Sequence, residues 1–258
     1  MSRQFTRDFL IEVAKGNIAG HAIVHKFGRN PSVGTSYVPL TIGGLYNTPQ
    51  VAGATTLRVK AGNANDTAAG TGAREITMIG LDETGAEVTE AVATAGASAS
   101  SATSATFMRL YRAYVSASGT YATASAGSHA ADIVIENGAG GTDWMTIDAT
   151  DFPRSQSEVA VYTVPINKTG YVMSLSVFTD STRTTNILFF KREAILQTAV
   201  PYDGMRLQLQ FQIGGGQGVL KPRSPITING PGDVGFMAKV EASTAEVAAD
   251  FEILVVDD

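Results

Sequence analysis

Apolar and polar residues alternate most clearly over residues 73–93, which read AREITMIGLDETGAEVTEAVA. Ile76 and Met78 fall on one side of an extended chain, and this period of two is typical of a half-buried strand. Between the two alternating runs, Asp82 can begin a turn and Gly85 can adopt a positive φ. The pattern predicts an antiparallel hairpin. Further short strands are expected within residues 55–62, 107–118, 131–138 and 144–149.

A second group of alternating runs follows Phe152-Pro153, with turn residues between them. Seven runs are strand-like: residues 157–165, 170–181, 186–193, 205–216, 226–232, 234–243 and 246–258. Strands at this spacing, without helical patterns between them, indicate antiparallel β-sandwich or jelly-roll domains. We therefore predict a mainly β protein with a first, hairpin-rich and projecting β domain over 51–150 and a β-sandwich or jelly-roll domain over 151–258.

The N-terminal 50 residues show a different pattern. Phe5, Phe9 and Val13 recur at i, i+4 and i+8, which predicts one short amphipathic helix that stops near Gly16. A helix this short is marginal alone, so its apolar stripe must dock on its own domain or on a neighbouring subunit. Residues 18–50 contain too many Gly and Pro for long elements, and we expect an extended arm with one or two short strands.

Residues 94–107, TAGASASSATSATF, consist almost entirely of small side chains. They lie between two strands of the first β group, so they do not link independent domains. A solvated linker usually carries Gly, Pro and charge, whereas side chains this small permit close approach of another backbone. Order against a neighbouring subunit and a long mobile loop are both open interpretations.

Composition narrows the classes of partner. The formal charge is −5 and the sequence pI is about 5.2, so phosphate backbones and anionic lipid are not expected to attract the chain. No apolar run is long enough to span a bilayer, and the N-terminal residues lack the unbroken apolar stretch of a signal peptide. Cysteine is absent, which removes disulfides and thiolate chemistry. We expect no nucleic-acid partner and no membrane association.

Candidate chemistry is sparse. His21 and His25 are four residues apart and His129 is distant, but no HExxH glutamate follows. Residues 61–73 superficially resemble a calcium loop, yet they offer only three suitable ligands: Asn63, Asn65 and Asp66. The acidic pairs available for glycoside hydrolysis are Asp82/Glu83, Glu87/Glu90 and Asp143/Asp148. Solvated charge is the default for these pairs, so we expect no metal, no cofactor and no enzymatic activity.

Three aromatic residues are candidates for contact with a ligand. Tyr111 and Tyr114 occur in the segment RLYRAY, and Trp144 is the single tryptophan. Rings beside acids and amides can stack on sugars, and Tyr, Trp and Arg are enriched in protein interfaces. Packing of some of these rings in a core is the alternative.

Several phrases of the sequence resemble structural proteins of tailed bacteriophages, especially those of aquatic and cyanobacterial hosts. They include VHKFGRNPSVGT, FMRLYRAYV, IENGAGGTDWMTI and FPRSQSEVAVYTVP, and the resemblance covers most of the chain. It implies a β-rich virion component that assembles in the host cytoplasm and is released by lysis. No set of functional residues comes with it.

Together these observations predict a virion structural protein that decorates or cements the capsid as a homo-oligomer, with a trimer expected. Its partners would be other copies of itself and the major capsid protein or another virion protein. We expect Phe5, Phe9 and Val13 to form the anchoring stripe. One alternative is a tail-associated adaptor or a receptor-binding protein that uses Tyr111, Tyr114 and Trp144 on host glycan. Another is a carbohydrate-active enzyme built on the acidic pairs.

Overall fold

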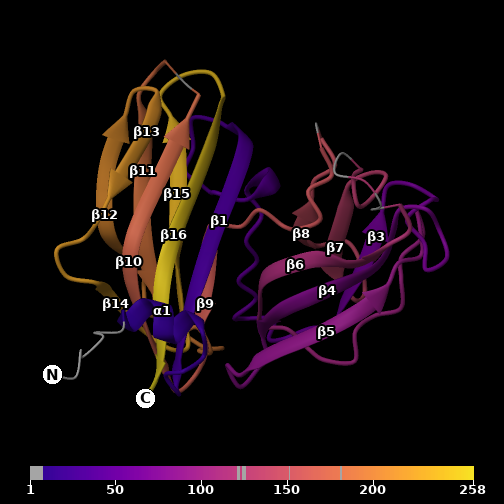
Figure 1. Ribbon diagram of the computed structural model, residues 1–258, viewed down its shortest axis with the longest axis horizontal. Coiled ribbons are helices and arrows are strands. Elements are labelled where there is room, and N and C mark those ends of the chain that lie inside the picture. The colour runs from indigo at the N-terminus through magenta and orange to yellow at the C-terminus, as the bar shows by residue number, and fades with distance from the viewer. Residues whose placement is uncertain (1–7, 121–122, 124–125, 151, 181) are drawn as a thin grey trace, which may run out of the picture.

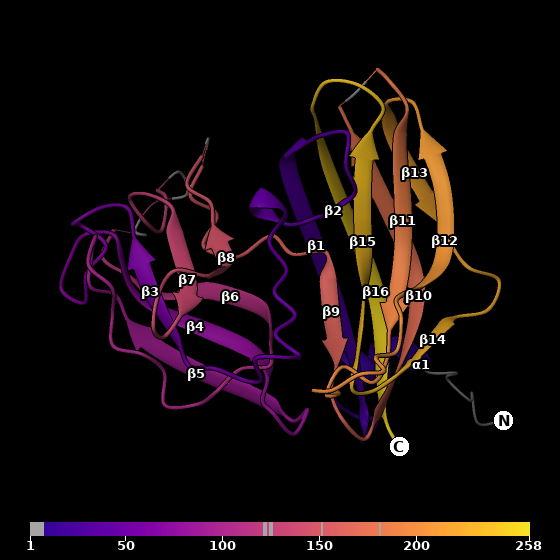
Figure 2. The same cartoon turned by 180° about the vertical axis from the view of Figure 1, so that it is seen from behind.

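A computed structural model describes residues 8–120, 123, 126–150, 152–180 and 182–258. Over these residues the protein is mainly β, with antiparallel pairing in each of its sheets and one short α-helix. Two lobes lie side by side: a tall β-sandwich, and a smaller lobe whose strands lie between residues 57 and 147 (Figure 1). The view from behind shows that the same two lobes meet along one side of the sandwich (Figure 2). The expected fold class is confirmed.

The sandwich contains the single helix and the strands from both ends of the sequence. These elements are α1 (Phe9–Ala14), β1 (His21–Val33), β2 (Val38–Pro39), the 3-10 turn η1 (Ile42–Gly44), β9 (Val161–Val164), β10 (Lys168–Thr179), β11 (Thr185–Arg192), β12 (Arg206–Ile213), β13 (Gly216–Leu220), β14 (Ile226–Asn229), β15 (Gly232–Val240) and β16 (Ala245–Asp257). The smaller lobe contains β3 (Leu57–Ala61), β4 (Ala73–Leu81), β5 (Glu87–Ala93), β6 (Arg109–Ser118), β7 (Ile133–Asn137) and β8 (Asp143–Ile147).

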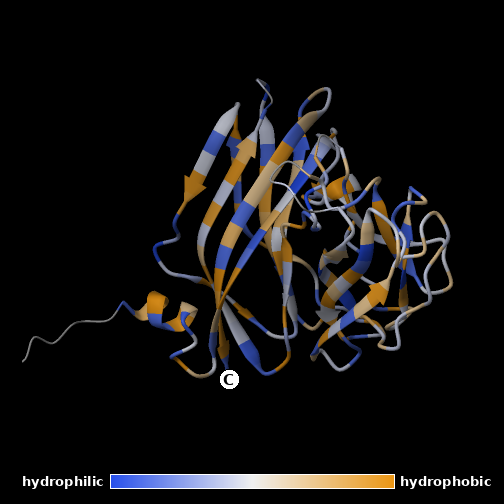
Figure 3. Cartoon of the chain, turned by 45° about the vertical axis from the view of Figure 1, so that its right-hand side comes forward, coloured by the Kyte–Doolittle hydropathy of each residue, from blue (hydrophilic) through white to orange (hydrophobic). Residues whose placement is uncertain are grey.

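Two sheets form the sandwich. One has the order β1-β16-β10-β13, with β14 pairing the first part of β10, and the other has the order β12-β11-β15-β2, with β9 also pairing β15. Their inner faces enclose a core in which the rings of Phe189, Phe236 and Phe251 lie 4.8 to 6.1 Å apart. Burial of such large apolar side chains is the main favourable term in folding. Alternating hydropathy along these strands is visible in Figure 3.

The smaller lobe packs two three-stranded sheets, β3-β7-β8 and β5-β4-β6, around a second core. The predicted hairpin is β4 and β5. Asp82 holds its turn, because its carboxylate accepts hydrogen bonds from the backbone N–H groups of Thr84 and Ala86 at 2.8 and 3.1 Å. Gly85 has a φ of +82°, as the sequence predicted.

Residues 18–50 differ from the expected arm. His21–Val33 form one long strand that pairs antiparallel with β16, from His21 opposite Val256 to Val33 opposite Ala245. The region is therefore part of the sandwich, and Gly28 allows close packing within the strand. A Cβ at Gly28 would lie only 2.0 Å from the backbone nitrogen of Ala160.

The small-residue segment 94–107 is ordered against its own lobe. It follows the outer edge of β3, where the backbone N–H of Ser100 donates to Val59 O at 2.8 Å and that of Thr103 donates to Leu57 O at 2.7 Å. The two hydroxyl groups accept hydrogen bonds from the N–H groups of the same two β3 residues, each at 2.9 Å. The expectation that a neighbouring subunit orders this segment is replaced by an intrachain explanation: small hydroxyl side chains cover an otherwise open sheet edge.

Candidate functional site

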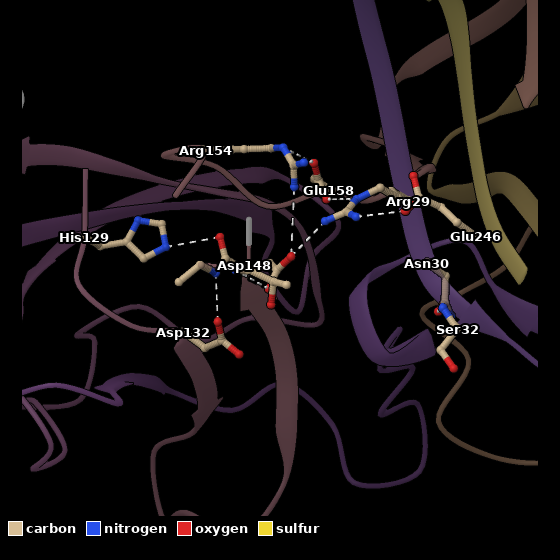
Figure 4. A network of polar contacts seen from close by, with 11 residues as sticks. Arg29, Asn30, Ser32, His129, Asp132, Asp148, Arg154, Glu158 and Glu246 are labelled. Atoms are coloured by element: carbon tan, nitrogen blue, oxygen red, sulfur yellow. Dashed lines mark hydrogen bonds and ion pairs between the residues drawn. The ribbon is translucent and has the colours of Figure 1, made fainter. Parts of the chain in front are cut away.

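The junction between the lobes contains a buried network of charges (Figure 4). Arg29 on β1 donates to Asp148 at 2.8 Å, to Glu158 at 2.9 Å and to Glu246 at 3.2 Å. Asp148 follows the last strand of the smaller lobe, whereas Glu246 belongs to β16 of the sandwich. Arg154 adds ion pairs to Glu158 at 3.5 Å and to Asp148 at 4.0 Å. One guanidinium thus ties three parts of the chain together.

A second buried group lies at the same junction. Arg109 on β6 is fully buried, and its guanidinium pairs with Asp233 of β15 at 3.1 Å. Asp233 also accepts hydrogen bonds from the hydroxyl groups of Tyr46 and Thr163, at 2.5 and 2.8 Å. Desolvation, together with the nearby Asp233 carboxylate, raises the pKa of Tyr46 well above its ordinary value. Each of these residues has a partner inside the protein, so the cluster fastens the lobes to each other, although the buried Nη2 of Arg109 makes no hydrogen bond.

Lys26 is the least usual charged residue of the junction. Its side chain is buried, and its ammonium group donates a hydrogen bond to the backbone carbonyl of Tyr111. The same ammonium nitrogen lies 5.7 Å from the centre of the Tyr111 ring. Desolvation, and next the positive charge of Arg112, lower the pKa of Lys26 to about 7. The side chain is therefore poised between its neutral and charged forms near neutral pH.

An open polar cleft of about 480 Å³ runs beside this junction. Its wall carries Arg112, Tyr114 and Arg154, together with side chains of small residues and an amide: Val115, Ser116, Ala117, Ser118, Ser128, Ser155 and Gln156. The guanidinium of Arg112 lies 5.7 Å from the centre of the Tyr114 ring. An arginine over an aromatic ring, surrounded by hydroxyl groups, is suited to contact a polar, hydroxyl-rich ligand.

The three candidate aromatic residues occupy different environments. Tyr111 is 4% exposed and packs edge-on against Tyr162 in the core of the sandwich, with ring centres 5.0 Å apart. Trp144 is 3% exposed and belongs to the core of the smaller lobe. These two rings face the interior and not a ligand, which corrects the expectation for them. Tyr114 alone of the three lines the cleft.

The predicted anchoring stripe is only partly on the surface. Val13 is buried on the sandwich, whereas Phe9, Leu10 and Ile11 are 48%, 41% and 53% exposed. Asp8 caps the helix by accepting hydrogen bonds from the N–H groups of Leu10 and Ile11. Phe5 lies outside the described residues. The apolar surface of α1 therefore consists of Phe9, Leu10 and Ile11, and Val13 holds the helix in place.

Sequence reasoning missed a second apolar surface, on the side of the sandwich farthest from the smaller lobe. There an apolar groove of about 320 Å³ opens between β12 and β13, lined by Leu175, Val177, Leu209, Gln210, Phe211, Ile213, Gly218, Val219 and Leu220. Val219 is 63% exposed and Leu207 is 50% exposed. The signal was present in the segment RLQLQFQI, whose alternation predicts a strand and whose polar positions after Arg206 are uncharged glutamines.

Three of the candidate catalytic and metal-binding residues make hydrogen bonds within the protein: Asp66, Glu87 and Glu90. Asp66 accepts hydrogen bonds from the N–H groups of Ala73 and Ala130 and thereby fastens its loop. Glu87 accepts one from the Tyr111 hydroxyl, and Glu90 accepts two from the backbone of the small-residue segment. Within the described residues, no three His, Asp or Glu side chains converge in a way that could hold a metal ion.

Comparisons with known proteins identify no relative by sequence: no family model matches the chain, and no curated protein does. The part of the chain that the structure describes contains no helix with the length and apolar character of a membrane span.

Solved structures similar to this chain include PirA, at 7% identity and a TM-score of 0.23, over 36% of this chain and 90% of the other. Infectious bursal disease virus, Gx strain, matches at 10% identity and a TM-score of 0.25, over 92% of this chain and 72% of the other. T=1 particles derived from infectious bursal virus match at 10% identity and a TM-score of 0.13, over 92% and 78% of the two chains. Likenesses this weak assign neither fold nor function.

Proposed function

We propose that this chain is a virion structural protein of a tailed bacteriophage that decorates or cements the capsid as a homo-oligomer. The observation that carries the proposal is the exposed apolar face of α1, formed by Phe9, Leu10 and Ile11. Exposed apolar side chains grouped on one helix are typical of an interaction site. The phrases shared with phage structural proteins supply the kind of particle.

In this proposal α1 attaches the protein to the shell. The buried Val13 holds the helix on the sandwich, and Asp8 caps the N-terminal end of the helix. The exposed side chains of Phe9, Leu10 and Ile11 insert between capsid subunits. Helices that present an apolar face commonly bind a hydrophobic groove in this way. The lobe junction keeps the rest of the molecule rigid above the attachment point.

The test is attachment of purified protein to capsids that lack it, measured by co-sedimentation. Phe9→Asp places a charge in a desolvated apolar contact, and we expect at least about a tenfold loss of affinity. Val51→Asp is the matched control, because Val51 is 78% exposed and lies outside α1. Unchanged attachment of the Phe9 variant, with an unaltered circular dichroism spectrum, would reject α1 as the anchor.

The polar cleft favours a second candidate function, a tail-associated receptor-binding protein that contacts host glycan. Tyr114 and Arg112 would provide the stacking surface and the hydrogen-bond donors for a sugar. Electron cryomicroscopy of the intact particle separates the two functions. Copies over the whole shell support decoration, whereas a few copies at the tail vertex favour the receptor-binding function.

A further inference from the structure

The outer strands of the sandwich next to the smaller lobe are protected against pairing with another chain. On β1, Pro31 and a register irregularity between Asn30 and Val33 interrupt the edge, and the charged side chains of Lys26 and Arg29 point to the lobe junction. On the opposite sheet, β2 is two residues long and ends in Pro39. Proline, bulges, charge and short length are the usual devices that prevent edge-to-edge association.

The smaller lobe protects its edges as well. Residues 99–103 cover β3, as described above. The backbone of 155–157 covers β6, with Val115 N–H donating to Ser155 O at 2.7 Å and Ser157 N–H donating to Ala113 O at 2.8 Å. Strand β5 carries the charged side chains of Glu87 and Glu90, and β8 is five residues long with Asp143 at its start.

The opposite side of the sandwich carries almost none of these devices. Strands β12 and β13 are the last strands of their two sheets, and each pairs with one neighbour only within the described chain. Residues 206–220 contain no proline, and their single charged residue is Arg206. The one register irregularity of β12 falls between Leu207 and Leu209, so the remainder of the strand is regular. Two adjacent strands therefore present unpaired backbone N–H and C=O groups.

The core of the sandwich also reaches the surface between these strands. Leu209 and Phe211 pair with the buried residues Phe189 and Ile187, so their side chains point inward and line the groove of about 320 Å³. On β13, Leu220 pairs with the buried Leu175 and is still 38% exposed. An uncovered core beside two open strand edges is a surface that predicts association.

From these observations we infer that the β12–β13 edge is an interface with a second copy of this chain. A second copy is the occupant that the charge pattern fits: a chain with net charge −5 repels itself in general, but this edge is nearly uncharged and lets two copies approach. It also brings the same open strands, whose backbone groups complement those of the first copy. The inference deepens the self-association in the proposed function by naming its surface.

A dimer with two-fold symmetry gives the open edges of both β12 and β13 a strand to pair with. A two-fold axis in the plane of the interface brings each open strand against an antiparallel partner, either its own counterpart or the other edge strand. Both arrangements continue the two sheets from one copy into the next and close the groove over Leu209, Phe211 and Leu220. A self-complementary face of this kind closes at two copies, so we expect a particle of twice the 27.0 kDa chain mass.

The experiment uses the purified full chain without capsids. The mass is measured by analytical ultracentrifugation over a range of concentrations, for the natural chain and for Gln210→Lys/Val219→Lys. Both residues are exposed and lie within their strands, so the fold is expected to persist. We expect the dissociation constant of the dimer to rise at least about tenfold, because lysine on an edge strand opposes pairing. The control Val51→Lys/Ser98→Lys adds the same charge at exposed positions outside β12 and β13.

Hydrogen exchange gives an independent readout. Backbone amides of β12 and β13 should exchange slowly in the concentrated natural chain and rapidly in the edge variant, with β16 unchanged in both. A monomeric natural chain, or an oligomer that survives the edge substitutions, would overturn the inference. Failure of capsid attachment is a separate result, since Phe9→Asp and the edge variant are scored in different assays.

Discussion

Replacing Arg29 by methionine tests how the lobes are held together. Methionine keeps much of the volume of the arginine stem but removes the charge that faces Asp148, Glu158 and Glu246. The side chains of Asp148 and Glu158 are 8% and 5% exposed, so two carboxylates would remain in a poorly solvated site. Removing one partner of a buried ion pair typically lowers stability by about 3–5 kcal/mol.

The expected loss lies at the lower end of that range. Arg154 stays close to Glu158 and Asp148, at 3.5 and 4.0 Å, and compensates part of the charge. Glu246 is 35% exposed, so its contribution is that of a screened surface pair. We therefore expect the free energy of unfolding to fall by about 3 kcal/mol. The control Lys168→Met breaks an exposed pair with Asp257 and should change it by less than about 1 kcal/mol.

The assay is equilibrium unfolding in urea at pH 7.5, followed by circular dichroism and tryptophan fluorescence. Fluorescence reports on Trp144 in the smaller lobe, so separation of the two transitions would show that the lobes have become uncoupled. Adding Asp148→Asn and Glu158→Gln to Arg29→Met removes the uncompensated charge and should recover a large part of the loss. A loss no greater than in the control, or no recovery in the triple variant, would refute the reasoning.

Three further predictions concern other parts of the structure. The pKa of Lys26 is lowered to about 7, so between pH 7 and 9 the unfolded chain binds a proton that the folded chain does not. The free energy of unfolding should therefore rise with pH by at most about 1.4 kcal/mol per unit. Urea unfolding of Lys26→Met at pH 7 and pH 9 should lack this rise, and an equal rise in the natural chain and the variant would contradict the prediction. Thr103→Val deprives the buried N–H of Leu57 of one acceptor and should lower the free energy of unfolding by about 1–3 kcal/mol, with little change for Ser101→Ala as a comparison. Gly28→Ala forces a methyl group against the backbone of Ala160 and should destabilise by about 3 kcal/mol in thermal unfolding, whereas Gly34→Ala, which meets no atom within 4 Å, should be nearly neutral.

Local patterns predicted the local elements of this fold. The alternation over 73–93 and the turn residues Asp82 and Gly85 were sufficient for the β4–β5 hairpin, because both strands and their turn are contiguous. The helix was likewise predicted from its apolar period, and it runs from Phe9 to Ala14. In these segments the sequence neighbours are also the spatial neighbours.

Pairings between distant segments were not predictable in the same way. Strand β1 forms because β16, at the other end of the sequence, offers a complete antiparallel partner, and no local signal in residues 21–33 announces that partner. A partner of this kind overrides the Gly and Pro content that indicated an arm.

At the candidate site, the sequence likewise did not predict which single residues are exposed. Alternation along β6 assigns Leu110 and Tyr111 to opposite faces, but it does not say which face is exposed. Strand β6 lies between the two lobes, so Leu110 enters one core and Tyr111 enters the other. Neither face is free, and the ring expected to meet a ligand is buried at the junction.

The pairing of β1 with β16 also orders the events of synthesis. All strands of the smaller lobe lie between residues 57 and 147, and its contacts can form while the rest of the chain is still on the ribosome. The sandwich, in contrast, leaves its first strand without a partner until the last strand has been made. The smaller lobe thus has the opportunity to fold first and, through the pairing of Asp148 with Arg29, to shelter β1 during the interval. Keeping that early strand against its own lobe would limit its pairing with other nascent chains.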